Sequence, residues 1–223
     1  MHIKEIVQKA YLHLQAVYRW FFVEHRGLVE KIVSRREYML YQRAGKLNPP
    51  EHQVKQRNIK YLAKLYDCTI LVETGTFKGD MVEAMKDNFD TIYSIELDNK
   101  LYITAKNRFA ESSHIHIIHG DSTEELPRIM EKINMRTIFW LDGHYCGDNT
   151  SKGIKLTPIL EELKTIFAGL DYGHVILIDD ARLFNGTNDY PTFPELITFL
   201  KENKPDVLIS VEDDAIRLAP GLR

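Results

Sequence analysis

Cysteine is scarce in this chain, with only Cys68 and Cys146 among 223 residues. Two cysteines cannot build a disulfide framework or a cysteine-based zinc site, so we expect a reducing compartment, the cytoplasm. Long apolar runs are also missing. No run is long enough to cross a bilayer, and the first residues lack the apolar segment of a secretory signal.

An excess of basic charge is missing as well. The formal net charge is −3, whereas proteins that bind nucleic acid usually present a strongly basic face, so we expect no nucleic-acid partner. The contents of hydrophobic residues (44%) and charged residues (27%) are ordinary for a globular protein. The length suits one large domain, alone or with a helical extension.

Residues 1–60 are expected to form that extension. Between residues 3 and 33 apolar side chains recur at helical spacing, and many of them are aromatic. Such a helix could cover the domain's own core, pair with a second copy in a homo-oligomer, or lie on a membrane surface; packing against protein is the favoured interpretation. After a break at Asn48-Pro49-Pro50, a second helix is predicted over residues 51–66, with one face formed by Val54, Asn58, Tyr61, Leu62 and Leu65.

From residue 61 to residue 223, strand-like runs alternate with helical patterns, which predicts an α/β domain. The runs are rich in Ile, Val and Leu, as parallel strands buried on both faces are. The last two runs are separated by only three residues and must pair antiparallel. We therefore predict a Rossmann-like, doubly wound, mostly parallel sheet that ends in an antiparallel hairpin. The predicted strands are 69–73, 91–96, 114–118, 137–141, 174–178, 206–211 and 215–219, and the predicted helices are 80–89, 99–110, 123–133, 157–167 and 193–203.

The stretch Ile70–Gly79 joins the first strand to a helix through a turn that contains two glycines. Such turns present backbone N–H groups to phosphate or nucleotide ligands, although glycine could also supply backbone freedom alone. The spacing of Gly75 and Gly79 is G-x-x-x-G, not the dinucleotide-binding G-x-G-x-x-G. Glu73 beneath the turn would repel a pyrophosphate and attract an ammonium or sulfonium group, such as that of S-adenosylmethionine (SAM).

An acidic residue stands at or just after the end of each of the first five predicted strands. Because the carboxyl ends of parallel strands meet at one edge of a sheet, such a cluster is unfavourable without cationic ligands. The second acid is placed to accept hydrogen bonds from ribose hydroxyls, and the third either binds an adenine amino group or caps the next helix. The acids are Glu73, Glu96, Asp121, Asp142 and the pair Asp179-Asp180.

Taken in order, the motifs E-x-G-x-x-x-G, I-E-L-D, H-G-D-S, L-D-G-H and I-D-D resemble those of class I SAM-dependent methyltransferases. The resemblance covers about residues 61–220, and the closing hairpin matches the reversed last strand of that fold. It implies that the cofactor is SAM and that the cofactor-binding residues are Glu73, Thr74, Gly75, Thr76, Gly79, Glu96, Asp121 and Ser122.

The last two motifs resemble the metal-dependent O-methyltransferases, such as the catechol, macrocin and mycinamicin enzymes. The resemblance implies a Mg²⁺ site formed by Asp142, Asp179 and Asp180, whose hard oxygens suit that ion. The alternative is that one of the adjacent pair caps a loop while the other faces solvent. His144 is the expected catalytic base, since an imidazole beside the ion could accept the proton of an acceptor hydroxyl; the sugar enzymes carry this histidine one residue further on.

We therefore expect a SAM-dependent, Mg²⁺-dependent O-methyltransferase that acts on a hydroxyl of a sugar, a glycan or another small molecule. The polar loop 145–153 would contact the substrate. Cys146 lies in that loop, but no histidine in a recognisable pattern makes it a nucleophile. Two other functions stay open. Glu73 and the glycine spacing disfavour a nicotinamide-dependent oxidoreductase, and the intact set of acids disfavours a non-catalytic protein that binds a nucleotide or a partner.

Overall fold

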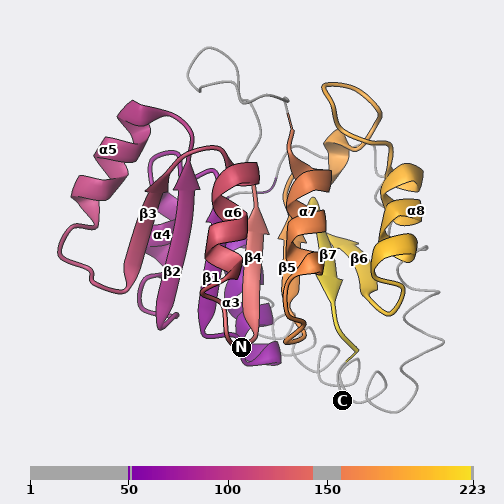
Figure 1. Ribbon diagram of the computed structural model, residues 1–223, viewed down its shortest axis with the longest axis horizontal. Helices are drawn as coiled ribbons and strands as arrows, with labels where there is room; N and C mark the ends of the chain where they lie inside the picture. Colours follow the sequence, from indigo (N-terminus) through magenta and orange to yellow (C-terminus); the bar gives the residue numbers. More distant parts are fainter. Residues whose placement is uncertain (1–49, 51, 143–156, 222–223) are drawn as a thin grey trace, which may run out of the picture.

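The computed structural model describes residues 50, 52–142 and 157–221. In this part of the chain seven strands form one sheet, in the order β3-β2-β1-β4-β5-β7-β6 (Figure 1). Strands β1 to β5 are parallel, and β7 pairs antiparallel with both β5 and β6. The predicted α/β fold with its closing antiparallel hairpin is confirmed.

The observed strand bounds agree with the predicted ones to within two residues, whereas the helix ends differ more; α4 in particular ends four residues before the predicted end. The strands are β1 Ile70–Thr74, β2 Thr91–Glu96, β3 Ile115–His119, β4 Thr137–Leu141, β5 Val175–Ile178, β6 Leu208–Glu212 and β7 Ala215–Ala219. The helices are α3 His52–Tyr66, α4 Asp80–Met85, α5 Asn99–Arg108, α6 Ser122–Met130, α7 Ile159–Ala168, α8 Phe193–Asn203 and the short 3₁₀ helix η1 Ala181–Leu183.

Alternate residues of the buried strands face opposite layers of helices. Ile70 and Val72 of β1 belong to the core cluster that includes α6, α7 and α8, whereas Leu71 between them belongs to the cluster that includes α3 and α4. Figure 1 shows α6, α7 and α8 in front of the sheet, α3 and α4 behind it, and α5 beside the edge strand β3. This period of two decides on which side of the sheet each strand-end side chain lies.

Helix α3 packs behind the sheet and runs across residue 60, the expected boundary between the extension and the domain. Its buried face consists of Asn58, Ile59, Leu62, Ala63 and Tyr66. The prediction that Tyr61 belongs to this face is wrong, because Tyr61 is 49% exposed. The rest of the expected extension, residues 1–49, lies outside the described residues. None of the helices within the described ranges combines the length and the apolar character that a membrane span needs.

Candidate active site

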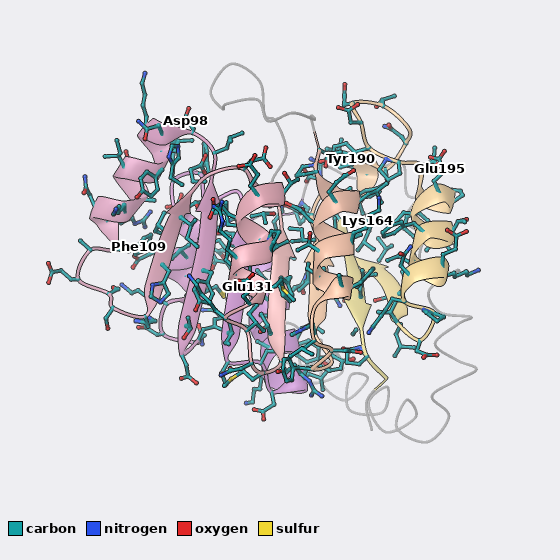
Figure 2. The ribbon with its side chains drawn as sticks, in the orientation of Figure 1. Asp98, Phe109, Glu131, Lys164, Tyr190 and Glu195 are labelled. Atoms are coloured by element: carbon teal, nitrogen blue, oxygen red, sulfur yellow. The ribbon has the colours of Figure 1, made fainter. Side chains whose placement is uncertain are left out.

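The carboxyl ends of the five parallel strands form one edge of the sheet, at the top of Figure 1. The strand order reverses between β1 and β4, and ligands of open α/β sheets bind in the crevice at such a switch point. Asp142 directly follows β4, and its backbone N–H donates to the Thr74 carbonyl at the end of β1 over 3.1 Å. Figure 2 shows Asp98 and Tyr190 at the same edge, on either side of this switch point.

The predicted cofactor turn folds back toward the end of β2. The N–H groups of Gly75 and Thr76 both donate to the Ile95 carbonyl, over 3.0 and 3.1 Å. Gly75 and Gly79 have φ angles of +89° and +77°, which residues with a side chain rarely adopt. A Cβ atom on Gly79 would also lie 2.8 Å from a ring carbon of Phe109. Both the backbone angle and the packing therefore require glycine at position 79.

Glu73 lies opposite Ser94 of β2 and is 2% exposed. The Ser94 hydroxyl donates to the Glu73 carboxyl, and the Ser94 and Thr76 hydroxyls are hydrogen-bonded at 2.6 Å. Burial, opposed by the bond from Ser94, raises the pKa of Glu73 to about 8. The carboxyl is therefore mostly uncharged near neutral pH, and a cationic ligand beside it would favour its charged form.

Glu96 ends β2 and holds the turn in place. One carboxylate oxygen accepts the N–H of Phe77 over 2.7 Å, and the other accepts the N–H of Asp98 over 2.8 Å. Burial raises the pKa of Glu96, although these backbone bonds oppose that effect. The sequence predicted only a ribose contact here. A carboxylate has about four acceptor sites, so Glu96 can organise the turn and still accept a ligand hydroxyl.

Asp121 caps helix α6, which was one of its two expected roles. Its carboxylate accepts both the backbone N–H and the hydroxyl of Thr123, over 2.9 and 2.7 Å. Ser122 is the first residue of that helix. A contact of either residue with adenine stays a prediction.

Asp142, Asp179 and Asp180 are brought together as predicted. One oxygen from each lies within 4.8 Å of the others. Asp179 and Asp180 are 3% and 4% exposed, so neither faces solvent. Burial, together with repulsion from Asp142 and Asp180, raises the pKa of Asp179. The buried Asp179 Oδ1 accepts no hydrogen bond within the described part of the chain, so this oxygen is available to a cation.

Lys55 of helix α3 lies against these acids, although no sequence motif singled it out. Its ammonium group forms an ion pair with Asp179 Oδ2 and lies 3.9 Å from Asp180 Oδ1. It also lies 6.0 Å from the ring centroid of Trp140. Burial lowers the pKa of Lys55, but the charge of Asp179 and its hydrogen bond, together with the charges of Asp142 and Asp180, outweigh this and raise the pKa above the ordinary value. The helix that was expected to be an accessory therefore contributes a side chain to the site.

Glu162 of α7 is a second residue that the sequence did not reveal. It is 1% exposed, and burial raises its pKa to about 7. With Asp142, Asp179, Thr157 and Tyr190 it lines a cavity of about 10 Å³, roughly the space of one water. A larger cavity of about 610 Å³ lies beside the edge strand β3, and none of the predicted site residues lines it.

The expected base and the expected substrate loop cannot be placed, because His144, Cys146 and the remainder of 143–156 lie outside the described residues. Arg182, which follows β5, pairs with Asp180 over 2.6 Å and also with Asp214. It therefore helps to compensate the charge of the acidic pair.

No protein-family model and no curated protein sequence matches the chain, but solved structures share its fold. An O-methyltransferase from Bacillus cereus, in complex with S-adenosylhomocysteine (SAH), is 13% identical with a TM-score of 0.56, over 92% of this chain and 96% of that one. The O-methyltransferase TomG from Streptomyces achromogenes, involved in tomaymycin synthesis and in complex with SAM, is 14% identical with a TM-score of 0.54, over 92% and 95%. An SAH-bound methyltransferase from Podospora anserina is 15% identical with a TM-score of 0.55, over 95% and 96%. The chain therefore has the fold of class I SAM-dependent O-methyltransferases.

Proposed function

We propose that the protein transfers a methyl group from SAM to a hydroxyl of a small molecule, and that a divalent cation, Mg²⁺, takes part. The observation that carries the proposal is the arrangement at one edge of the sheet. In the strand order shared with methyltransferases, the glycine turn and Glu96 lie on one side of the crevice and the three aspartates on the other. The similar structures in complex with SAM or SAH support the choice of cofactor.

The cofactor half consists of the turn from Glu73 to Gly79 together with Glu96. Asp121 and Ser122, which follow β3, complete the proposed cofactor site. The sulfonium and ammonium groups of SAM are cationic, so they would stabilise the charged form of Glu73. Glu96 would accept the ribose hydroxyls while its bond to the Phe77 N–H keeps the turn closed. The G-x-x-x-G spacing, with a buried acid below it, still counts against a dinucleotide.

The metal half fits a hard divalent cation. The three carboxylates supply clustered oxygen donors, and one of them, Asp179 Oδ1, is buried without a hydrogen bond from the described residues. Mg²⁺ bound there would orient the acceptor hydroxyl and make it more acidic. Asp142, Asp179 and Asp180 would hold the ion, and His144, two residues after Asp142 in the chain, would accept the acceptor's proton. A sugar or glycan hydroxyl is the acceptor we favour.

Methyl transfer from isotopically labelled SAM to a panel of sugars, catechols and other hydroxylated acceptors tests this proposal. Activity should disappear in chelator and return with added Mg²⁺, whereas SAM binding should persist in both, because the cofactor contacts lie on other strands. His144→Ala should lower turnover by roughly 10²- to 10⁴-fold without loss of the metal. Asp179→Asn should instead weaken Mg²⁺ binding. Full activity in chelator would remove the metal from the mechanism.

A further inference from the structure

We propose that the Lys55 ammonium is a built-in counter-ion of the three-aspartate cluster, and that it gives way when a divalent cation binds there. Helix α3 would then sense whether the metal is loaded. This inference rests on the proposed function only in that it requires a divalent cation at Asp142, Asp179 and Asp180.

The Lys55 ammonium and a metal ion would bind to the same carboxylates. Lys55 pairs with Asp179 Oδ2 and lies 3.9 Å from Asp180 Oδ1. Both acids belong to the set whose oxygens lie within 4.8 Å of one another. An ammonium and a metal ion bound to this one cluster of carboxylates would lie close together. Two cations that are close together repel each other strongly in a site from which water is largely excluded. The ammonium and the metal ion therefore compete for this cluster.

Helix α3 holds this lysine against the acids. Lys55 lies one helical turn before Ile59, which is 0% exposed in the core behind the sheet. Ile178 packs on the opposite face of the sheet, so alternation turns the next residue, Asp179, toward the α3 side. The ion pair joins residues 124 positions apart in the chain. It is a consequence of the fold and not of local sequence.

The Lys55 side chain lies near enough to solvent for its ammonium group to move away from the aspartates. Its side chain is 15% exposed, against 2% for that of Asp179, so part of the lysine already reaches solvent while the aspartate does not. The Trp140 ring, whose centroid is 6.0 Å from the ammonium, is buried, so its cation–π contact belongs to the paired position and is lost when the ammonium moves outward. The flexible four-carbon stem permits this movement while Ile59 keeps the helix in place.

Calorimetric titration of the full chain with Mg²⁺ tests the competition. The titration is done at about pH 8, where free carboxyls are ionised. Lys55→Met keeps the stem but removes the charge, and it should bind Mg²⁺ about tenfold more tightly than the wild type, or better. Lys60→Met, on the exposed side of the same helix, should match the wild type. If Lys55→Met does not fold, Lys55→Gln replaces it. Unchanged or weaker affinity in the Lys55 variant would overturn the proposal.

Amine acetylation read by mass spectrometry gives a second test, on the wild type itself. Lys55 should be protected without the ion and should react faster when Mg²⁺ is present, while Lys60 should react equally in both. Equal protection of Lys55 with and without Mg²⁺ contradicts the inference. Mg²⁺ binding by the wild type distinguishes the two failures: a wild type that binds Mg²⁺ but shows no effect of Lys55 overturns only this inference, whereas one that binds no Mg²⁺ also contradicts the metal half of the proposed function.

Discussion

Replacing Glu73 with glutamine should remove a large part of the pH dependence of stability in the cofactor-free protein. Burial raises the pKa of Glu73 from 4.5 to about 8, so the folded protein keeps this proton over a pH range in which the unfolded chain loses it. The resulting stabilisation is fully present below pH 4.5 and is lost as the pH rises toward 8. For this one carboxyl the loss amounts to roughly 4 kcal/mol of unfolding free energy.

Glutamine imitates the uncharged acid, because its carbonyl oxygen can still accept the bond from the Ser94 hydroxyl. Urea unfolding of the two proteins, followed by circular dichroism between about pH 5 and pH 8 without cofactor or metal, measures the difference. The wild type should lose stability steeply, and Glu73→Gln much less. Glu111→Gln, at an exposed position, should behave like the wild type. Parallel pH profiles for the wild type and Glu73→Gln would refute the assigned burial penalty.

Three further predictions follow from the turn and from helix α3. Glu96→Ala should weaken SAM binding in calorimetry by about 1.5–3 kcal/mol, because the ribose and the Phe77 N–H lose their acceptor; equal affinity would contradict the assignment. Gly79→Ala should lower the free energy of unfolding by about 1–3 kcal/mol, because φ is +77° and the new Cβ would meet the Phe109 ring; an unchanged urea midpoint would argue against this. A chain that starts at residue 51 should melt cooperatively and bind SAM, whereas one that starts at residue 67 should not, because it lacks the buried face of α3; equal melting of both would show that α3 is dispensable.

The sheet was predictable because it depends on short-range signals. Each strand is a run of apolar residues, and three-residue spacing between the last two runs leaves only an antiparallel pairing. The gathering of acids at one edge was predictable for the same reason. Parallel strands align their carboxyl ends, so an acid after each strand must come near the others, as Asp142 and Asp179 do.

The role of the helices' charged residues was not predictable, because a helical pattern normally assigns charges to solvent. Glu162 follows another glutamate in the first turn of α7, where acids are expected on dipole grounds alone. Only the rotation of that helix against the sheet reveals its burial. In the sequence, Lys55 has the context of an ordinary surface lysine. Only the packing of α3 behind β4 and β5 brings it to the acids. For the same reason, the sequence prediction wrongly included Tyr61 in the buried face of α3.

Asp121 illustrates a different limit. The same residue type at the start of a helix serves both as a cap and as a cofactor ligand, and the sequence pattern is identical for the two. The hydrogen bonds from Thr123 establish the cap. A cofactor contact depends on a ligand that binds later, so no pattern in the chain alone distinguishes the two uses.

Calorimetric titration of the full chain with SAM, NAD⁺ and ATP, each with and without Mg²⁺, tests the central claim most directly. SAM should bind under both conditions, because the turn at Gly75–Gly79 and the acids Glu73 and Glu96 lie on strands other than those that carry the metal cluster. NAD⁺ and ATP should not bind, since the G-x-x-x-G turn at Gly75 and Gly79 lacks the glycine spacing with which such turns bind dinucleotide phosphates. Binding of NAD⁺ or ATP without binding of SAM would contradict the account.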